Sequence, residues 1–265
     1  MSGSRRLTRF RAARGRLRLG EWVGLDALLP LQGDLFGETR PDGDPVPLAG
    51  LSLLAPVVPS KVVGVGSNYR AHALEMGKAV PEVPRIFLKP STSVIGPGEP
   101  ILVPPRTTRV DHEAELGVVI GRTMSRVSAA SALDYVLGYT VVNDVTARDF
   151  QKADGVFARA KGFDSFCPMG PCITTGLDPA DLAVRAWVNG QLRQDGRTSD
   201  MVFDVPALLA FISEIMTLLP GDVIATGTPS GVGPLQHGDV VEVEVEGVGR
   251  LQNPVRDRED RAGAA

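Results

Sequence analysis

The hydrophobic residues of this chain gather in short runs, most of which are bounded by Gly or Pro. Such runs predict β-strands, because an amphipathic helix needs apolar residues at three- and four-residue spacing over a longer stretch. The clearest run lies near the C-terminus, where valines alternate with glutamates, so that the valines would face a core and the glutamates solvent. The predicted strands cover residues 62–65, 86–88, 116–120, 139–142, 184–188, 223–225 and 240–245.

Few segments have a helical pattern. We expect a short helix over 129–136 and a longer one over 206–218, the latter capped by Asp204. A further short helix would begin at Asn68 and end at Gly77. Many strands and few helices predict an α+β, mainly β fold, built as a sandwich or roll and not as a doubly wound sheet.

The chain divides by composition into two parts. Residues 1–56 predict a small β-rich N-terminal domain, and a Pro-rich break separates it from a main domain over 57–265. Seven arginines lie among the first 18 residues, as in a transit peptide. Alternation in 7–11 and 16–19 favours instead a hairpin with an arginine-coated face. We expect the charged C-terminal tail, residues 256–265, to fray.

Composition narrows the classes of function. A chain of 265 residues that is 43% hydrophobic can bury a sizeable core. A net charge of -3 and an aromatic content of 5% argue against nucleic-acid partners, and no apolar run approaches the ~20 residues of a membrane span. Cys167 and Cys172 form neither a zinc site nor a disulfide framework, so we expect free thiols in a cytoplasmic protein.

The most informative stretch is the acidic run at residues 111–121. Asp111, Glu113 and Glu115 alternate, and alternate residues of a strand share one face, where burying like charges is costly unless something neutralises them. The apolar run that ends at Asp144 supplies a further acid. Glu113, Glu115 and Asp144 would then form an all-oxygen site that suits Mg²⁺, Mn²⁺ or Ca²⁺. The alternative is an edge strand with its acids in water.

Three other segments carry candidate chemistry. His72 and Glu75 are three residues apart, so on a helix they share a face and could act as a carboxylate-oriented general base. Lys161 lies in a compact loop and could hold a substrate carboxylate or an enolate oxygen. The glycine-rich run around Thr228 could bind an anion. The alternatives are a surface His–Glu contact, a solvated lysine and a tight hairpin.

Together these segments resemble the fumarylacetoacetate hydrolase superfamily. The resemblance covers residues of about 60 to 255, and it depends on six sequence blocks that occur in the family's order. The blocks are GSNYRAHALE (66–75), FLKP (87–90), DHEAELG (111–117), NDVTARD (143–149), AKGFD (160–164) and TGTPSGVG (226–233).

The resemblance implies a mixed β-sandwich roll that is usually a homodimer. It also implies a lid that orders when substrate binds and carries the His72–Glu75 dyad. By resemblance, Mg²⁺ or Mn²⁺ is held by Glu113, Glu115 and Asp144, catalysis uses His72, Glu75 and Lys161, and the substrate contacts Tyr69, Gln151 and Thr228.

The implied activity belongs to the bacterial branch that includes 2-hydroxyhepta-2,4-diene-1,7-dioate isomerases and acylpyruvate hydrolases of aromatic catabolism. The metal would act as a Lewis acid that stabilises an enolate of a 2-oxo or 2-hydroxydienoic (di)carboxylate. Isomerisation, decarboxylation and C–C bond hydrolysis all remain open, including acylpyruvate hydrolysis and oxaloacetate decarboxylation. An alternative of another class is a non-catalytic binding protein that a metal stabilises.

Overall fold

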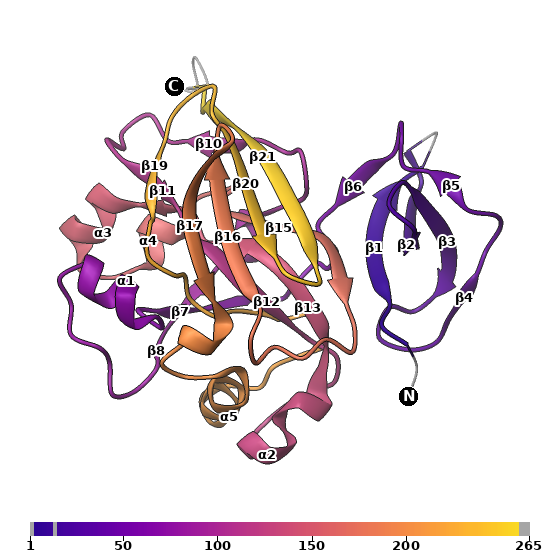
Figure 1. Cartoon of the computed structure of the whole chain (residues 1–265), viewed down its shortest axis with the longest axis horizontal. Helices are drawn as coiled ribbons and strands as arrows, with labels where there is room; N and C mark the ends of the chain where they lie inside the picture. Colours follow the sequence, from indigo (N-terminus) through magenta and orange to yellow (C-terminus); the bar gives the residue numbers. More distant parts are fainter. Residues whose placement is uncertain (1–2, 13–14, 260–265) are drawn as a thin grey trace, which may run out of the picture.

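A computed structural model describes residues 3–12 and 15–259. The fold is α+β and mainly β, as predicted, with short helices at the periphery of the sheets (Figure 1). The helices are α1 (Arg70–Glu75), α2 (Ala129–Ala132), α3 (Arg148–Asp154), α4 (Ala158–Lys161) and α5 (Val205–Ile215). Short 3₁₀ turns cover Ser91–Ser93, Leu133–Tyr135 and Thr198–Asp200.

The strands form three sheets. In the largest sheet the main path runs β4-β3-β2-β1-β15-β13-β12-β18-β7-β8, and a five-stranded sheet runs β10-β21-β20-β16-β17. The large sheet contains β1 (Arg6–Arg11), β2 (Leu17–Val23), β3 (Ala27–Gly33), β4 (Thr39–Pro41), β5 (Val46–Pro47), β6 (Ser52–Leu54), β7 (Val62–Gly66), β8 (Arg85–Lys89), β9 (Val94–Ile95), β12 (Ala114–Ile120), β13 (Val136–Asn143), β15 (Cys167–Thr174) and β18 (Val223–Ala225). The five-stranded sheet contains β10 (Ile101–Val103), β16 (Ala183–Val188), β17 (Gln191–Arg197), β20 (Val240–Val245) and β21 (Gly249–Asp257). A third sheet contains β11 (Val110–His112), β14 (Thr146–Ala147) and β19 (Gly233–Leu235).

The main core lies between the large sheet and the five-stranded sheet. Val118 of β12 belongs to the same buried cluster as Val184 of β16 and Val243 of β20. Val119 points to the opposite face of the large sheet and packs there in a second cluster with Val62. Because successive strand residues point to opposite faces, a strand buried on both faces is a continuous apolar run, as β12 is. The predicted sandwich-like packing is confirmed.

The N-terminal strands form the predicted hairpin, in which Arg11 pairs with Leu17, although residues 13–14 lie outside the described part. Strand β1 also pairs with β15, where Leu7 lies opposite Ile173. The N-terminal strands are therefore hydrogen-bonded to the large sheet even though they stand apart at one side (Figure 1). The boundary at residue 56 stays a prediction. The first two residues of the expected frayed tail end β21, and residues 260–265 are outside the described part.

Helices α2 and α5 form where the sequence predicted them and differ from the prediction only at their ends. The carboxylate of Asp204 accepts a hydrogen bond from the backbone N–H of Ala207 at 2.9 Å, so the predicted cap of α5 is confirmed. Helix α5 ends at Ile215 because Met216 has an extended backbone. Helix α2 is shorter than predicted because Val136 already begins β13.

The prediction that Asn68 caps α1 is wrong. Tyr69 occupies the cap position, and the Asn68 side chain instead donates to the backbone carbonyls of Thr226 and Phe203, at 2.7 and 3.0 Å. The Asn68 side chain therefore connects the segment before α1 to the residue that follows β18, Thr226. Gly77 does end the helix, as predicted, with a left-handed φ of 64° that favours glycine.

Both cysteines lie in β15 and are free and buried, as predicted. Burial raises the pKa of the Cys167 thiol to about 12. Such a thiol stays protonated at neutral pH and behaves as a small apolar side chain. No helix in the described ranges combines the length and the apolar character that a membrane crossing requires.

Asp222 joins the segment of Ser60 and Lys61 to the turn before β18. Its carboxylate is fully buried and accepts hydrogen bonds from the backbone N–H groups of Ser60, Lys61 and Leu219. It also accepts from the Ser60 hydroxyl and forms an ion pair with Lys61. Burial opposes ionisation, but these donors outweigh it and lower the pKa of Asp222.

We expect Asp222→Asn to lower the free energy of unfolding by about 2–4 kcal/mol, because donors aimed at a carboxylate lose their charged acceptor. A carboxyl group with a depressed folded-state pKa stabilises above its unfolded pKa, and that contribution is lost as pH falls through the folded pKa. The deficit of the variant should therefore shrink below about pH 4. Urea unfolding at pH 7 and at acid pH measures both effects.

The matched control is Asp195→Asn, since Asp195 pairs with Arg185 at 2.8 Å on the surface with its side chain 55% exposed. Exposed pairs contribute about 0–1 kcal/mol, so this variant should unfold almost like the wild type. Equal destabilisation by both substitutions would contradict the role of Asp222.

Candidate functional site

The acidic run changes sheets at Glu113. Strand β11 belongs to the three-stranded sheet, β12 belongs to the large sheet, and Glu113 lies between them. The prediction that Asp111 shares one face with both glutamates is therefore wrong. Asp111 instead forms ion pairs with Arg109 at 2.9 Å and with Arg148 at 2.8 Å. Alternation in sequence puts residues on one face only while the strand continues without a break.

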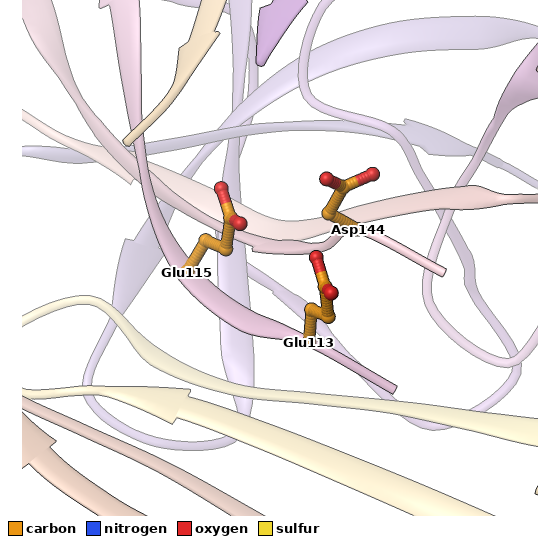
Figure 2. Close-up of side chains that lie close together, drawn as sticks. All are labelled: Glu113, Glu115 and Asp144. Atoms are coloured by element: carbon orange, nitrogen blue, oxygen red, sulfur yellow. The ribbon is translucent and has the colours of Figure 1, made fainter. Parts of the chain in front are cut away.

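The three remaining acids do converge. Ala114 of β12 pairs with Asn143 of β13, so the next residue, Asp144, lies beside Glu113, whose carbonyl accepts the Asp144 backbone N–H at 2.9 Å. One carboxylate oxygen from each of Glu113, Glu115 and Asp144 lies within 4.8 Å of the others, and all three residues are buried. Figure 2 shows the three carboxylates pointing into one space.

Two buried lysines contact this cluster. The Lys161 ammonium donates to Glu113 at 2.7 Å, to Asp144 at 2.5 Å and to the Thr146 hydroxyl at 2.8 Å. Lys89 of β8 donates to the second oxygen of Asp144 at 2.6 Å. All three hydrogens of Lys161 already have acceptors, so this side chain is fixed as a positive charge in the site.

Arg148 and Lys89 were not among the predicted site residues. Arg148 begins α3 and donates to Glu113 at 2.6 Å while it also pairs with Asp111. Both residues lie inside the recognised sequence blocks, at FLKP and NDVTARD. The available signal was a lysine at the end of an apolar strand, because a buried lysine needs an acidic partner.

Glu115 is the carboxylate that lacks a cation. Within the described chain it makes no ion pair, and its one hydrogen bond comes from the backbone N–H of Gly227 at 2.9 Å. Burial and the charges of Asp144 and Glu113 raise the pKa of Glu115 well above its usual range. Burial also opposes ionisation of Glu113, but Lys161 and Arg148 outweigh it and lower the pKa of that carboxyl.

This charge distribution fits a hard divalent cation. A buried carboxylate without a cation, next to two others, leaves a deficit of positive charge at the point where the three oxygens meet. Carboxylate oxygens are the ligands that Mg²⁺ and Mn²⁺ prefer. Glu113, Glu115 and Asp144 would hold the ion.

The predicted dyad forms beside the cluster. His72 Nδ1 lies 3.1 Å from a carboxylate oxygen of Glu75, and the other oxygen of Glu75 accepts the backbone N–H of Gly231 at 2.9 Å. His72 is buried and lines the same cavity as Glu113. With Nδ1 hydrogen-bonded to Glu75, Nε2 is the ring nitrogen that remains for a proton transfer.

Six of the nine predicted site residues line a narrow inner cavity of about 20 Å³, and Glu75 and Asp144 are not among them. Gln151 lines it while accepting a hydrogen bond from Arg148 at 3.0 Å. Tyr69 does not line it: the Tyr69 hydroxyl is buried without a hydrogen-bond partner, and burial, Glu115 and Asp200 raise its pKa. Its predicted substrate contact stays a prediction. The full lining of this inner cavity is Val65, Gly66, Ser67, His72, Met76, Lys78, Glu113, Glu115, Arg148, Gln151, Phe157, Lys161 and Thr228.

Thr228 is oriented from behind by Gln194 of β17. The Gln194 amide nitrogen donates to the Thr228 hydroxyl at 2.7 Å, and its amide oxygen accepts from the Ala114 backbone N–H at 3.0 Å. His112, which is also buried, contacts the same amide oxygen through Nδ1 at 3.0 Å. Because an amide oxygen only accepts hydrogen bonds, Nδ1 of His112 carries the proton. Because the Thr228 oxygen accepts from Gln194, its hydroxyl hydrogen is free to donate into the inner cavity.

We expect Glu115→Gln to leave the metal-free protein as stable as the wild type or more stable at pH 7. An acid with a raised folded-state pKa lowers stability once pH exceeds its unfolded pKa, and glutamine removes that cost while keeping the Gly227 contact. Mg²⁺ or Mn²⁺ should raise the melting temperature of the wild type and not of the variant. The control is Glu214→Gln, an exposed position on α5. An equal metal-induced rise in melting temperature for Glu115→Gln and wild type would contradict the proposed set of metal ligands.

A second prediction concerns Gln194→Glu. The new carboxylate still accepts from Ala114 and His112 but cannot donate to Thr228, whose hydroxyl would then turn toward it. Oxalate affinity, measured by calorimetry with Mg²⁺, should fall roughly tenfold, the effect of one charged hydrogen bond. Thr228→Val, which removes the same donor, should weaken oxalate to a similar degree. Unchanged oxalate binding in Gln194→Glu would show that Gln194 does not orient Thr228.

Comparison with known proteins identifies relatives of this chain. Residues 61–256 match the family described as fumarylacetoacetate (FAA) hydrolase C-terminal. The oxaloacetate tautomerase YisK of Bacillus subtilis is 43% identical over 223 residues, which cover 78% of this chain and 74% of that protein. A crystal structure of 2-hydroxyhepta-2,4-diene-1,7-dioate isomerase from Mycobacterium marinum has 46% identity and a TM-score of 0.89, over 97% of this chain and 100% of that one.

A third relative was solved with bound ligands. Maleylpyruvate hydrolase from Sphingobium sp. SYK-6, in complex with manganese(II) and pyruvate, has 34% identity and a TM-score of 0.80, over 96% of this chain and 100% of that one. The family match spans the acidic cluster, the dyad and the glycine-rich run, which are the segments that form the inner cavity. The chain therefore belongs to the fumarylacetoacetate hydrolase family.

Proposed function

We propose that this protein is a divalent-metal-dependent enzyme that acts on 2-oxo or 2-hydroxydienoic (di)carboxylates by isomerisation, decarboxylation or C–C bond hydrolysis. The observation that carries the proposal is that His72 of the His72–Glu75 dyad lines one cavity with Glu113 and Glu115 of the buried three-carboxylate cluster. A bound Mg²⁺ or Mn²⁺ would supply Lewis-acid polarisation of the 2-oxo group. The relatives named above comprise a tautomerase, an isomerase and a hydrolase.

His72 is the residue we assign to proton transfer. The Glu75 carboxylate holds Nδ1, so the tautomer with a free Nε2 is favoured. Glu75 is itself held by the Gly231 backbone N–H, which fixes α1 against the glycine-rich run. The dyad can therefore take a proton from a carbon acid or from water without moving far.

Lys161, Thr228 and Gln151 bind and orient the substrate in this proposal. The carboxylates of Glu113 and Asp144 accept hydrogen bonds from the Lys161 ammonium and hold it in place. Its positive charge would favour the negative charge that develops on an enolate. Thr228 lines the inner cavity, and its hydroxyl can donate to a substrate carboxylate because its oxygen already accepts from Gln194. Gln151 has an amide group there whose oxygen is already engaged by Arg148, so its nitrogen remains as a donor.

Hydrolysis of acylpyruvates is the second candidate. The inner cavity of about 20 Å³ has room for about one water molecule, and His72 lines it. A water at this position could be deprotonated by Nε2 and attack a distal carbonyl. Isomerisation needs only that the same nitrogen moves a proton between two substrate atoms, so the same residues serve both reactions.

The experiment is a substrate panel assayed with Mg²⁺ and with EDTA. It contains oxaloacetate, an acylpyruvate and a 2-hydroxymuconate-like diacid. We expect turnover of at least one compound, lost with EDTA and reduced about 10³-fold or more in Asp144→Ala, because that change removes a ligand and leaves Lys89 without its acid. Activity that persists in EDTA would overturn the metal-dependent assignment.

His72→Ala provides the internal control, because it should keep metal-induced thermal stabilisation while losing proton transfer. Hydrolysis should fall by about 10² to 10⁴, the usual contribution of a general base. Oxaloacetate decarboxylation needs no attacking water and should fall less. Equal loss of both reactions would contradict the role given to His72.

A further inference from the structure

The inner cavity opens into a second, larger space. This outer cavity has a volume of about 870 Å³ and shares Met76, Lys78, Arg148, Gln151 and Phe157 with the inner cavity. The inner cavity, at about 20 Å³, accommodates little more than one water-sized group. Whatever part of a bound molecule extends beyond the reacting head group must therefore lie in the outer cavity.

The outer cavity carries excess positive charge. Lys78, Arg85 and Lys152 line it, and within the described ranges none of the three makes an ion pair or a side-chain hydrogen bond. Arg109 and Arg148 line it too, but both are already paired with Asp111. Three cations thus face one space without a protein acid to neutralise them.

The acids of the outer cavity are not available to these cations. Asp111 is buried and engaged by two guanidinium groups. Glu75 is hydrogen-bonded through one oxygen to His72 and through the other to the Gly231 backbone N–H. The wall of the outer cavity therefore carries a net positive charge that ion pairs within the protein do not neutralise.

Lys78 is the most informative of the three cations because it lines both cavities. It follows α1, is half-buried, and places its ammonium 6.0 Å from the centre of the Phe157 ring. Burial and the like charges of Arg148 and Arg85 lower the pKa of Lys78, as expected for an ammonium that faces other cations. An anion at this position would relieve that repulsion.

We propose that the outer cavity binds the second carboxylate of a dicarboxylate substrate, that Lys78 is the residue that selects it, and that Arg85 and Lys152 reinforce the selection. The inference rests on the proposed function, because it assumes that the 2-oxo head group binds at the three-carboxylate cluster. It narrows the substrate class to 2-oxo diacids whose far end is charged. A long apolar tail would leave three cations without a counter-charge.

The test compares two ligands of equal length, 2-oxoadipate and 2-oxohexanoate, which differ by a distal carboxylate in place of a methyl group. Binding is measured by calorimetry with Mg²⁺ at low ionic strength, where exposed charges are least screened. Wild-type protein should bind the diacid at least tenfold more tightly. Lys78→Met should weaken binding of the diacid roughly tenfold to a hundredfold, the range for one charged hydrogen bond, and leave 2-oxohexanoate unchanged.

Two further variants test whether the effect of Lys78→Met comes from the lost charge at this position. The alternatives are a structural change and the lower net charge of the protein. Lys78→Arg keeps a cation at the position and should retain the preference for the diacid. Arg256→Met removes a positive charge from an exposed position of β21 that does not line either cavity, so it should change neither affinity.

The outcomes are distinguishable. Equal affinity of the wild type for the two ligands, or equal weakening of both by Lys78→Met, overturns the assignment of the outer cavity and leaves the proposed function standing. If neither ligand binds to the wild type in the presence of Mg²⁺, the proposed function fails, and the inference fails with it.

Discussion

The cost of burying charge governs the architecture of this site. Glu113, Glu115 and Asp144 lie out of water, where each carboxylate is expensive unless a counter-charge or a hydrogen-bond donor meets it. The structure meets that cost with Lys161 and Lys89, and it leaves Glu115 with a single backbone donor. The cluster is thus stabilised on one side and left short of positive charge on the other. That asymmetry is the reason the cluster fits a hard cation in the function we propose.

The sequence predicts this cluster well for a simple geometric reason. Glu113 and Glu115 are two residues apart at the start of an apolar strand, and Asp144 follows the end of another, so only the pairing of those strands had to be supplied. The prediction for Asp111 is wrong because alternation along the sequence does not reveal where a chain passes from one sheet to another. Lys89 and Arg148 were missed because a single sequence does not distinguish a solvated cation from one whose acid is a distant residue.

The fold shows the same division between local and distant information. Short apolar runs identified the strands, and Asp204 identified the start of α5, because both signals are local. Asn68 looked like a helix cap for the same local reason, but its amide is used by Thr226 and Phe203 far along the chain. The pairing of β1 with β15 was equally hidden, since composition marked the N-terminal strands as a separate unit.

That pairing has a consequence for the solubility of the protein. Strand β15 carries both buried cysteines, and beyond β13 its other side is completed by two remote segments, β9 near Cys167 and β1 near Thr174. An unprotected flank on so apolar a strand would present free amide and carbonyl groups to other chains, the usual starting point of intermolecular sheet growth. The N-terminal strands therefore occupy an edge of β15 that would otherwise be free to pair with another chain.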